Sequence, residues 1–223
     1  MPTRLTVPVP LGGDAFATSP VHELKAIVDL PDEPWSSLVL LHGAGGSATH
    51  PWMAGLADGL AAAGVAVLRA SFPNAEAGRS QPEPAKRAIA AWHAIMAAAR
   101  EALPHEPWAG GKSFGGRMAA WAVAEGMPAA GILSLGYPLH PPGRPERLRT
   151  EHLAELTLPQ RFVQGTNDPF QSGTLLRDLV ASLPDGRIDW VEGGDHSFLV
   201  AGGDRDPGRV ARAIAPRVAA MLR

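Results

Sequence analysis

The sequence predicts an α/β fold, with a mostly parallel, doubly wound sheet flanked by helices and preceded by an antiparallel hairpin. After residue 35, short apolar runs alternate with segments of helical periodicity, and the connections between them are short. Strands that are apolar on both sides are typical of a parallel sheet covered by helices on both faces. With 223 residues in the chain, we expect a single domain spanning residues 1–223.

The first elements are a hairpin, a buried strand and a helix. Residues 5–11 and 22–30 are extended segments separated by a stretch rich in turn-forming residues, which predicts antiparallel pairing. Residues 37–43 (SLVLLHG) predict a central parallel strand. Residues 50–64 then have apolar side chains at helical spacing, with Pro51 suited to a first turn.

The alternation continues to the C-terminus. Residues 85–103 predict an amphipathic helix with Trp92 and Met96 on its apolar face and Lys86 and His93 on its solvated face. Further strands are expected at residues 65–72, 107–113, 130–139, 161–168 and 187–196. Further helices are expected at residues 116–126, 148–156, 173–183 and 206–222.

The composition excludes several classes of function. With 20 basic and 22 acidic residues the net charge is -2, which favours neither nucleic acid nor an acidic membrane as a partner. The absence of cysteine excludes disulfides, thiolate metal sites and a cysteine nucleophile. No apolar run resembles a signal peptide or a membrane span, so we expect a soluble protein of the cytoplasm. The oligomeric state stays open.

The segment Gly111-Lys112-Ser113-Phe114-Gly115 lies at a predicted strand-to-helix junction. A Gly-x-Ser-x-Gly pattern in this context predicts a nucleophile elbow, a sharp turn that exposes the serine hydroxyl at the end of a strand. Glycines on both sides are needed because larger side chains would collide with the neighbouring strand and helix. The alternative is a plain glycine-rich turn or a phosphate-binding loop, although the full spacing of a phosphate loop is absent.

A serine hydroxyl needs a base to remove its proton and an acid to orient that base. Asp168 follows the apolar part of one predicted strand, RFVQG (161–165), and His196 follows that of another, IDWVE (188–192). The order Ser, Asp, His is the one this chemistry takes on α/β sheets. Loops at the carboxyl ends of parallel strands meet at one edge, so these side chains are expected to converge with Ser113. Taken alone, Asp168 also suits an Asx turn or helix cap, and His196 a solvated loop.

An oxyanion hole is expected from the backbone N–H groups of Phe114 and Ala44. Phe114 follows the candidate nucleophile, and Ala44 lies in the glycine-rich loop after the strand 37–43. His42 begins that loop and is the main competitor of His196 for the role of base, but bracing of the loop is the favoured interpretation. The other histidines lack a strand-end partner pattern, and no cofactor or metal site is expected.

Five motifs together resemble the α/β-hydrolase superfamily: LLHGAGG, GGKSFGGRMA, SLGYPLHPPG, QGTNDPF and GGDHSF. From about Ser36 to the C-terminus the chain resembles the dienelactone-hydrolase-like branch. It looks closest to the small group that includes testis-expressed and acetyltransferase-complex members. The resemblance implies Ser113 as nucleophile, Asp168 as acid and His196 as base, with Ala44 and Phe114 as oxyanion donors. Ester or thioester hydrolysis is the activity it implies, and some relatives are assembly subunits.

We therefore expect a serine hydrolase acting on a small ester or thioester, and the alternative is a non-catalytic interaction module with the same fold. The intact Ser, Asp and His pattern favours the enzyme. Residues 140–159, between two predicted strands, are too few for a lid domain, so an open site is expected.

Four other side chains are candidates for contact with a substrate. Arg117 lies in the first helical turn after Ser113, where a cation opposes the helix dipole. It either pairs with an acidic side chain or binds a substrate carboxylate or phosphate. Tyr137, Trp52 and Phe170 line the pocket or pack in the core.

Overall fold

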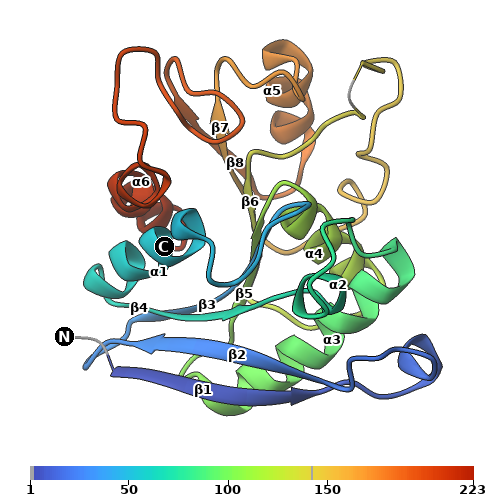
Figure 1. Cartoon of the computed structure of the whole chain (residues 1–223). Helices are drawn as coiled ribbons and strands as arrows, with labels where there is room; N and C mark the ends of the chain where they lie inside the picture. Colours follow the sequence, from blue (N-terminus) through green and yellow to red (C-terminus); the bar gives the residue numbers. More distant parts are fainter. Residues whose placement is uncertain (1–2, 142) are drawn as a thin grey trace.

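The structure is a computed structural model that describes residues 3–141 and 143–223, and it is built around one eight-stranded sheet (Figure 1). The order of the strands in the sheet is β1-β2-β4-β3-β5-β6-β7-β8. The strands are β1 (Thr3–Pro10), β2 (Glu23–Leu30), β3 (Ser36–Leu41), β4 (Val65–Ala70), β5 (Trp108–Lys112), β6 (Ile132–Leu135), β7 (Gln160–Gly165) and β8 (Gly186–Val191). The α-helices are α1 (Pro51–Ala62), α2 (Pro73–Glu76), α3 (Ala85–Ala102), α4 (Phe114–Ala124), α5 (Gly173–Ser182) and α6 (Pro207–Met221).

The predicted N-terminal hairpin and parallel sheet are both confirmed. β1 pairs antiparallel with β2, and β2 pairs antiparallel with β4. Every later pairing, from β3 with β4 to β7 with β8, is parallel. The carboxyl ends of the parallel strands therefore meet at one edge of the sheet, where ligands bind in folds of this class.

Helices cover both faces of the sheet. α1 and α6 pack together on one face, while α3 and α4 cover the other (Figure 1). β3 shows how one strand serves both layers, because Leu38 and Leu40 belong to the core under α1 and α6, whereas Val39 and Leu41 belong to the core under α3 and α4. This is the two-residue alternation of a strand buried on both sides.

The helix predicted at residues 148–156 is wrong, because that segment forms turns and irregular backbone. The side-chain amide of Gln160 donates to the carbonyl oxygens of Leu153 and Leu156, at 2.9 and 3.4 Å. The first residue of β7 thus supplies the hydrogen bonds that a helix would have given these carbonyls. The side chains of Leu153 and Leu156 are buried although the segment is not helical. Two short elements were not predicted, a 3₁₀ turn at Asp14–Phe16 and the single-turn helix α2.

In the ranges 3–141 and 143–223, no helix is both long and apolar enough to cross a membrane.

A buried ion pair ties the N-terminal strands to the loop after β3. Asp29 of β2 and Arg69 of β4 are both almost fully buried, and the Arg69 Nη2 lies 2.9 Å from Oδ2 of Asp29. The Nη1 of Arg69 donates to the carbonyl of Ala48 at 2.6 Å. Arg4 also reaches Asp29, with 2.6 Å between Nε and Oδ1. The cation therefore holds Ala48, at the end of the glycine-rich loop that follows β3.

We predict that Arg69→Met lowers the free energy of unfolding by about 3 kcal/mol, because it leaves the buried Asp29 carboxylate with only one cationic partner. Chemical denaturation monitored by circular dichroism measures this. Arg187→Met is the control, since Arg187 is exposed and lies 4.0 Å from Asp185, so its loss should change stability by less than about 0.5 kcal/mol. Equal stability of the two variants would contradict the role given to Arg69.

Candidate active site

Ser113 occupies a strained turn between β5 and α4. Its backbone has φ 50° and ψ −112°, a region that non-glycine residues rarely adopt. The turn is fixed on both sides: the Ser113 N–H donates to the carbonyl of Leu135 at 2.9 Å, and the Ser113 carbonyl accepts from the N–H of Arg117 at 3.1 Å. The strand-to-helix elbow expected from the sequence is therefore present.

The glycines around Ser113 are required by close backbone contacts. A Cβ placed on Gly111 would lie 2.5 Å from the carbonyl carbon of Gly115, and a Cβ on Gly115 would lie 2.5 Å from the carbonyl oxygen of Leu41. In both cases the obstacle is backbone, which cannot move aside as a flexible side chain can. Helix α4 thus packs directly on β5 and β3, and this packing sets the position of the serine.

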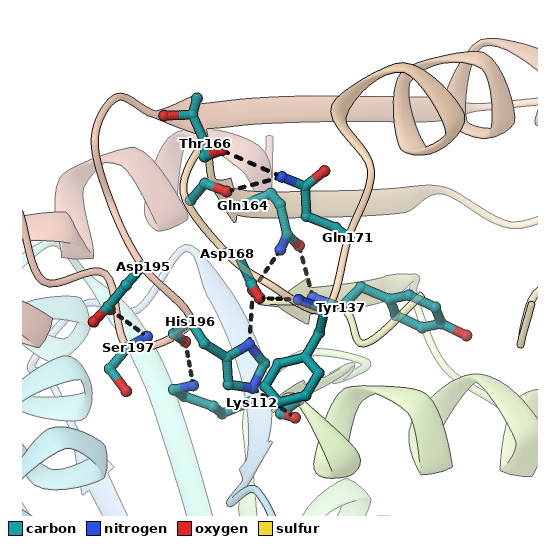
Figure 2. Close-up of polar contacts among 12 residues, drawn as sticks. Lys112, Tyr137, Gln164, Thr166, Asp168, Gln171, Asp195, His196 and Ser197 are labelled. Atoms are coloured by element: carbon teal, nitrogen blue, oxygen red, sulfur yellow. Dashed lines mark hydrogen bonds and ion pairs between the residues drawn. The ribbon is translucent and has the colours of Figure 1, made fainter. Parts of the chain in front are cut away.

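The structure brings Ser113, His196 and Asp168 into one chain of hydrogen bonds. The Nε2 of His196 lies 2.9 Å from the hydroxyl of Ser113. Its Nδ1 lies 2.7 Å from Oδ2 of Asp168 (Figure 2). A carboxylate only accepts, so the proton of His196 is on Nδ1, which leaves Nε2 free to accept the serine proton. Asp168 is buried, while the imidazole keeps an exposed edge.

The carboxylate of Asp168 is oriented by two further donors. The side-chain amide of Gln164 donates to Oδ2 at 2.6 Å, and the N–H of Phe170 donates to Oδ1 at 2.8 Å. Gln164 is itself held, because its Oε1 accepts from the N–H of Tyr137 at 2.7 Å (Figure 2). No motif in the sequence marks Gln164, which lies in β7 four residues before Asp168.

The loop that carries His196 is anchored from two sides. Oδ1 of Asp195 accepts from the N–H groups of Ser197 and Leu199, at 2.7 and 2.9 Å, which forms a tight turn. From the opposite side, Nζ of Lys112 donates to the carbonyl of His196 at 2.6 Å (Figure 2). Lys112 directly precedes Ser113, so one dipeptide positions both partners of the hydrogen bond between serine and histidine.

The Lys112 ammonium lies close to the rings of Trp52 and Phe198. Burial lowers the pKa of Lys112 to about 8, and the charges of Asp168 and Asp195 only partly oppose this effect. Most Lys112 side chains therefore carry a positive charge at neutral pH, directly behind the histidine loop.

Ala44 and Phe114 both line the cavity in front of Ser113. Within residues 3–141 and 143–223, neither of their backbone N–H groups donates to another protein group, as expected for the first residue of helix α4. The loop lies close, since a Cβ on Gly43 would be 3.4 Å from Cβ of Ser113. These two amides therefore lie at the cavity in front of Ser113, and their role as oxyanion donors stays a prediction.

His42 braces the glycine-rich loop instead of approaching Ser113. Its Nε2 accepts from the N–H of Phe72 at 3.0 Å, so its proton is on Nδ1, which donates to the carbonyl of Gly43 at 2.7 Å. Burial also lowers the pKa of His42, which favours the neutral ring. With both nitrogens engaged, His42 has none left for the serine proton.

The cavity above the serine has a volume of about 810 Å³. Phe170 lines it, as one alternative predicted, and Trp52 meets both alternatives because it lines the cavity and is also buried in the core. Tyr137 does not, because it is fully buried and its hydroxyl donates to the carbonyl of Arg149 at 2.6 Å. The wall also includes His140 and Arg149, which no sequence motif marks as site residues.

Among the described residues, no cluster of three or more histidine, cysteine or acidic side chains has the geometry to hold a metal ion.

Comparison with known proteins identifies the fold. The family described as alpha/beta hydrolase domain matches residues 34–217. Dienelactone hydrolase from Anabaena variabilis superposes with a TM-score of 0.71 at 21% identity, covering 100% of this chain and 99% of that one.

Two other solved structures are similar over nearly their whole length. An alpha-beta serine hydrolase homologue from Coxiella burnetii has a TM-score of 0.67 at 18% identity, covering 99% of this chain and 97% of that one. A serine hydrolase from Xanthomonas campestris, described as lacking a lid, has a TM-score of 0.64 at 19% identity, with coverage of 97% and 93%. At these identities the likeness to solved structures establishes the fold. The expected grouping with testis-expressed and acetyltransferase-complex members stays a prediction.

We predict that Gly115→Ala strongly destabilises the protein and displaces Ser113, because the new Cβ would overlap the Leu41 carbonyl oxygen. The expected loss is about 3 kcal/mol or more, as for other overpacked or strained substitutions. The matched control is Gly173→Ala at the start of α5, where the nearest atom would be 3.9 Å away. Thermal denaturation should separate the two variants, and comparable melting temperatures would contradict this account of the turn.

We also predict that Lys112 makes the stability of the protein depend on pH. Between about pH 8 and the ordinary lysine pKa of 10.5, the unfolded chain binds a proton that the folded protein has released. Stability therefore rises with pH in this interval. Relative to Lys112→Met, the wild-type protein should gain about 1 kcal/mol or more between pH 7 and pH 10. Urea denaturation at both pH values measures the difference, and parallel pH profiles would refute the prediction.

Proposed function

This chain belongs to the alpha/beta hydrolase domain family, and from that premise we propose that it is a serine hydrolase. Its substrate is a small carboxylic ester or thioester, which it cleaves through a covalent acyl-enzyme. The family supports hydrolase activity, and so does the fold shared with proteins described as serine hydrolases. The ester or thioester bond, the roles of the individual residues and the covalent intermediate are our proposal.

One observation carries the proposal: the unbroken chain of hydrogen bonds from Asp168 through His196 to Ser113, with distances of 2.7 and 2.9 Å. A serine hydroxyl is a weak nucleophile until a base within hydrogen-bond reach accepts its proton. A buried carboxylate on the far nitrogen of that base fixes its tautomer and stabilises the imidazolium. The three side chains thus have the donors and acceptors that activation of the serine hydroxyl requires.

In the first half of the reaction, the Ser113 oxygen attacks the substrate carbonyl carbon while Nε2 of His196 takes the hydroxyl proton. The carbonyl oxygen becomes an oxyanion, and the Ala44 and Phe114 N–H groups stabilise it. The tetrahedral species collapses, the bond to the alcohol or thiol breaks, and His196 returns the proton to that leaving group. An acyl group is left on Ser113.

In the second half, water replaces the departed alcohol or thiol. Nε2 of His196 accepts a proton from the water as its oxygen attacks the acyl carbon, and the same two amides hold the second oxyanion. The bond to the Ser113 oxygen then breaks, His196 returns the proton to the serine, and the carboxylic acid leaves. Asp168 stays ionised throughout, because it accepts hydrogen bonds from His196, Gln164 and Phe170.

The pocket favours small substrates. The described residues between β6 and β7 form no inserted domain over Ser113, and the imidazole of His196 keeps an exposed edge. Apolar rings from Trp52 and Phe170 form part of the wall, which suits a short acyl chain or a small aromatic group. A long lipid would require more burial than this wall supplies.

We predict that Ser113→Ala lowers kcat for p-nitrophenyl acetate by at least about a thousandfold, since the covalent route needs the hydroxyl. Release of p-nitrophenol monitored at neutral pH measures the effect. Ser182→Ala, at an exposed position of α5, should retain the wild-type rate. Circular dichroism of both variants shows whether they are folded.

The result also separates an enzyme from an interaction module. A wild-type protein without turnover on a panel of short-chain esters and thioesters would favour the module. Turnover that survives in folded Ser113→Ala would remove Ser113 from the role of nucleophile.

A further inference from the structure

Two arginine side chains face the active-site cavity without an acidic partner. Arg117, in the first turn of α4, and Arg149, in the segment after β6, both line the pocket that contains Ser113 and His196. Neither guanidinium forms an ion pair or a hydrogen bond with any group in the described ranges 3–141 and 143–223. Arginine is seldom left unpaired when it is partly buried, because its desolvation is costly.

Arg117 has a buried guanidinium nitrogen, Nε, that lacks a hydrogen-bond partner in the described part of the chain. The ring of Phe114 has its centre 5.8 Å from Cζ of Arg117, a cation–π contact that supplies no acceptor oxygen. The ion pair with an acidic side chain, one of the two alternatives for Arg117, is not formed within the described ranges. The position also opposes the dipole of α4, so stability alone gives no reason for a cation here.

Arg149 is held in place through its backbone. The hydroxyl of Tyr137 donates to its carbonyl at 2.6 Å, and its N–H donates to the carbonyl of Leu139 at 2.9 Å. Both contacts leave the guanidinium free. The fully buried Tyr137 thus fixes the segment that brings Arg149 to the pocket.

The two cations are close enough to influence one another. Burial is the main cause that lowers the pKa of Arg117, and the charge of Arg149 lowers it further. Glu151 acts in the opposite direction, but this exposed carboxylate accepts from the N–H of Thr150 at 2.9 Å and forms no ion pair with either arginine within the described residues. An anion between the arginines would offset both their desolvation and their repulsion.

We propose that Arg117 and Arg149 form an anion-binding subsite, and that the preferred substrate is an ester or thioester carrying a carboxylate or a phosphate. This inference rests on the proposed hydrolase function and names its substrate class. Guanidinium groups bind two oxygens of a carboxylate or a phosphate through paired, charge-assisted hydrogen bonds. The N–H of Arg117 donates to the Ser113 carbonyl, so the subsite begins one helical turn from the nucleophile.

The test compares two esters that differ in one terminal group. Mono-p-nitrophenyl adipate ends in a carboxylate, and p-nitrophenyl hexanoate has the same chain length with a methyl end. The wild-type enzyme should favour the adipate at least about tenfold in kcat/KM, the usual range for a charge-assisted pair. Arg117→Gln and Arg149→Gln should each lower that ratio about tenfold.

Arg147→Gln is the matched control, because it removes the same charge from an exposed position two residues from Arg149. It should leave the ratio as in the wild type. If the variant of the more buried Arg117 fails to fold, Arg149→Gln still tests the subsite. Equal use of the two esters, or a ratio that Arg147→Gln lowers as much as the other variants, would overturn the subsite. Turnover of the hexanoate would then leave the hydrolase function intact.

Binding tests the subsite without turnover. In the Ser113→Ala protein, calorimetry should detect monomethyl adipate and inorganic phosphate, the latter separating a phosphate preference from a carboxylate preference. Arg117→Gln in that background should weaken the tighter of the two at least about tenfold. If neither ester is hydrolysed but this weakening is observed, the proposed function fails and the anion site stands. Affinities that Arg117→Gln and Arg149→Gln leave unchanged, or no binding, would overturn the site.

Discussion

The contact between the backbone of α4 and the strands beneath it is the constraint on which the site depends. Gly111 and Gly115 allow the start of the helix to lie against β5 and the end of β3, with no room for even one carbon atom between them. The chain can turn this sharply only if Ser113 adopts φ 50°, at a cost in local strain. As a result, the hydroxyl projects beyond the end of the strand, and the first backbone N–H groups of α4 lie next to it.

The other parts of the site are positioned relative to this turn. β7 supplies Gln164 and the loop with Asp168, and the loop after β8 supplies His196, so the parallel order of the strands brings distant residues to one edge. Lys112 then links the turn to the histidine loop through the carbonyl of His196. Ser113, His196 and the amides of Ala44 and Phe114 are thus held by backbone contacts and short hydrogen bonds, one of which comes from the side chain of Lys112.

Much of this arrangement could be predicted from the sequence, because local patterns specified it. Strand periodicity located the sheet, and the glycines around Ser113 located the elbow. Long-range partners left no such pattern. Gln164 looks like any polar residue near a strand end until its bonds to Asp168 and Tyr137 are seen. The helical spacing at residues 148–156 misled, since Gln160 satisfies the carbonyls that a helix would have used. Arg149 reaches the pocket because Tyr137 anchors that non-helical segment.

The central claim is that this geometry makes one hydroxyl in the chain reactive. The most direct test treats the purified wild-type protein with a fluorophosphonate, whose phosphorus a base-activated serine attacks with loss of fluoride. Intact-mass spectrometry and peptide mapping then count and locate the adducts. The account predicts one adduct, on Ser113, and none after replacement of His196 by alanine. An unmodified protein, or an adduct on a different serine, would contradict it.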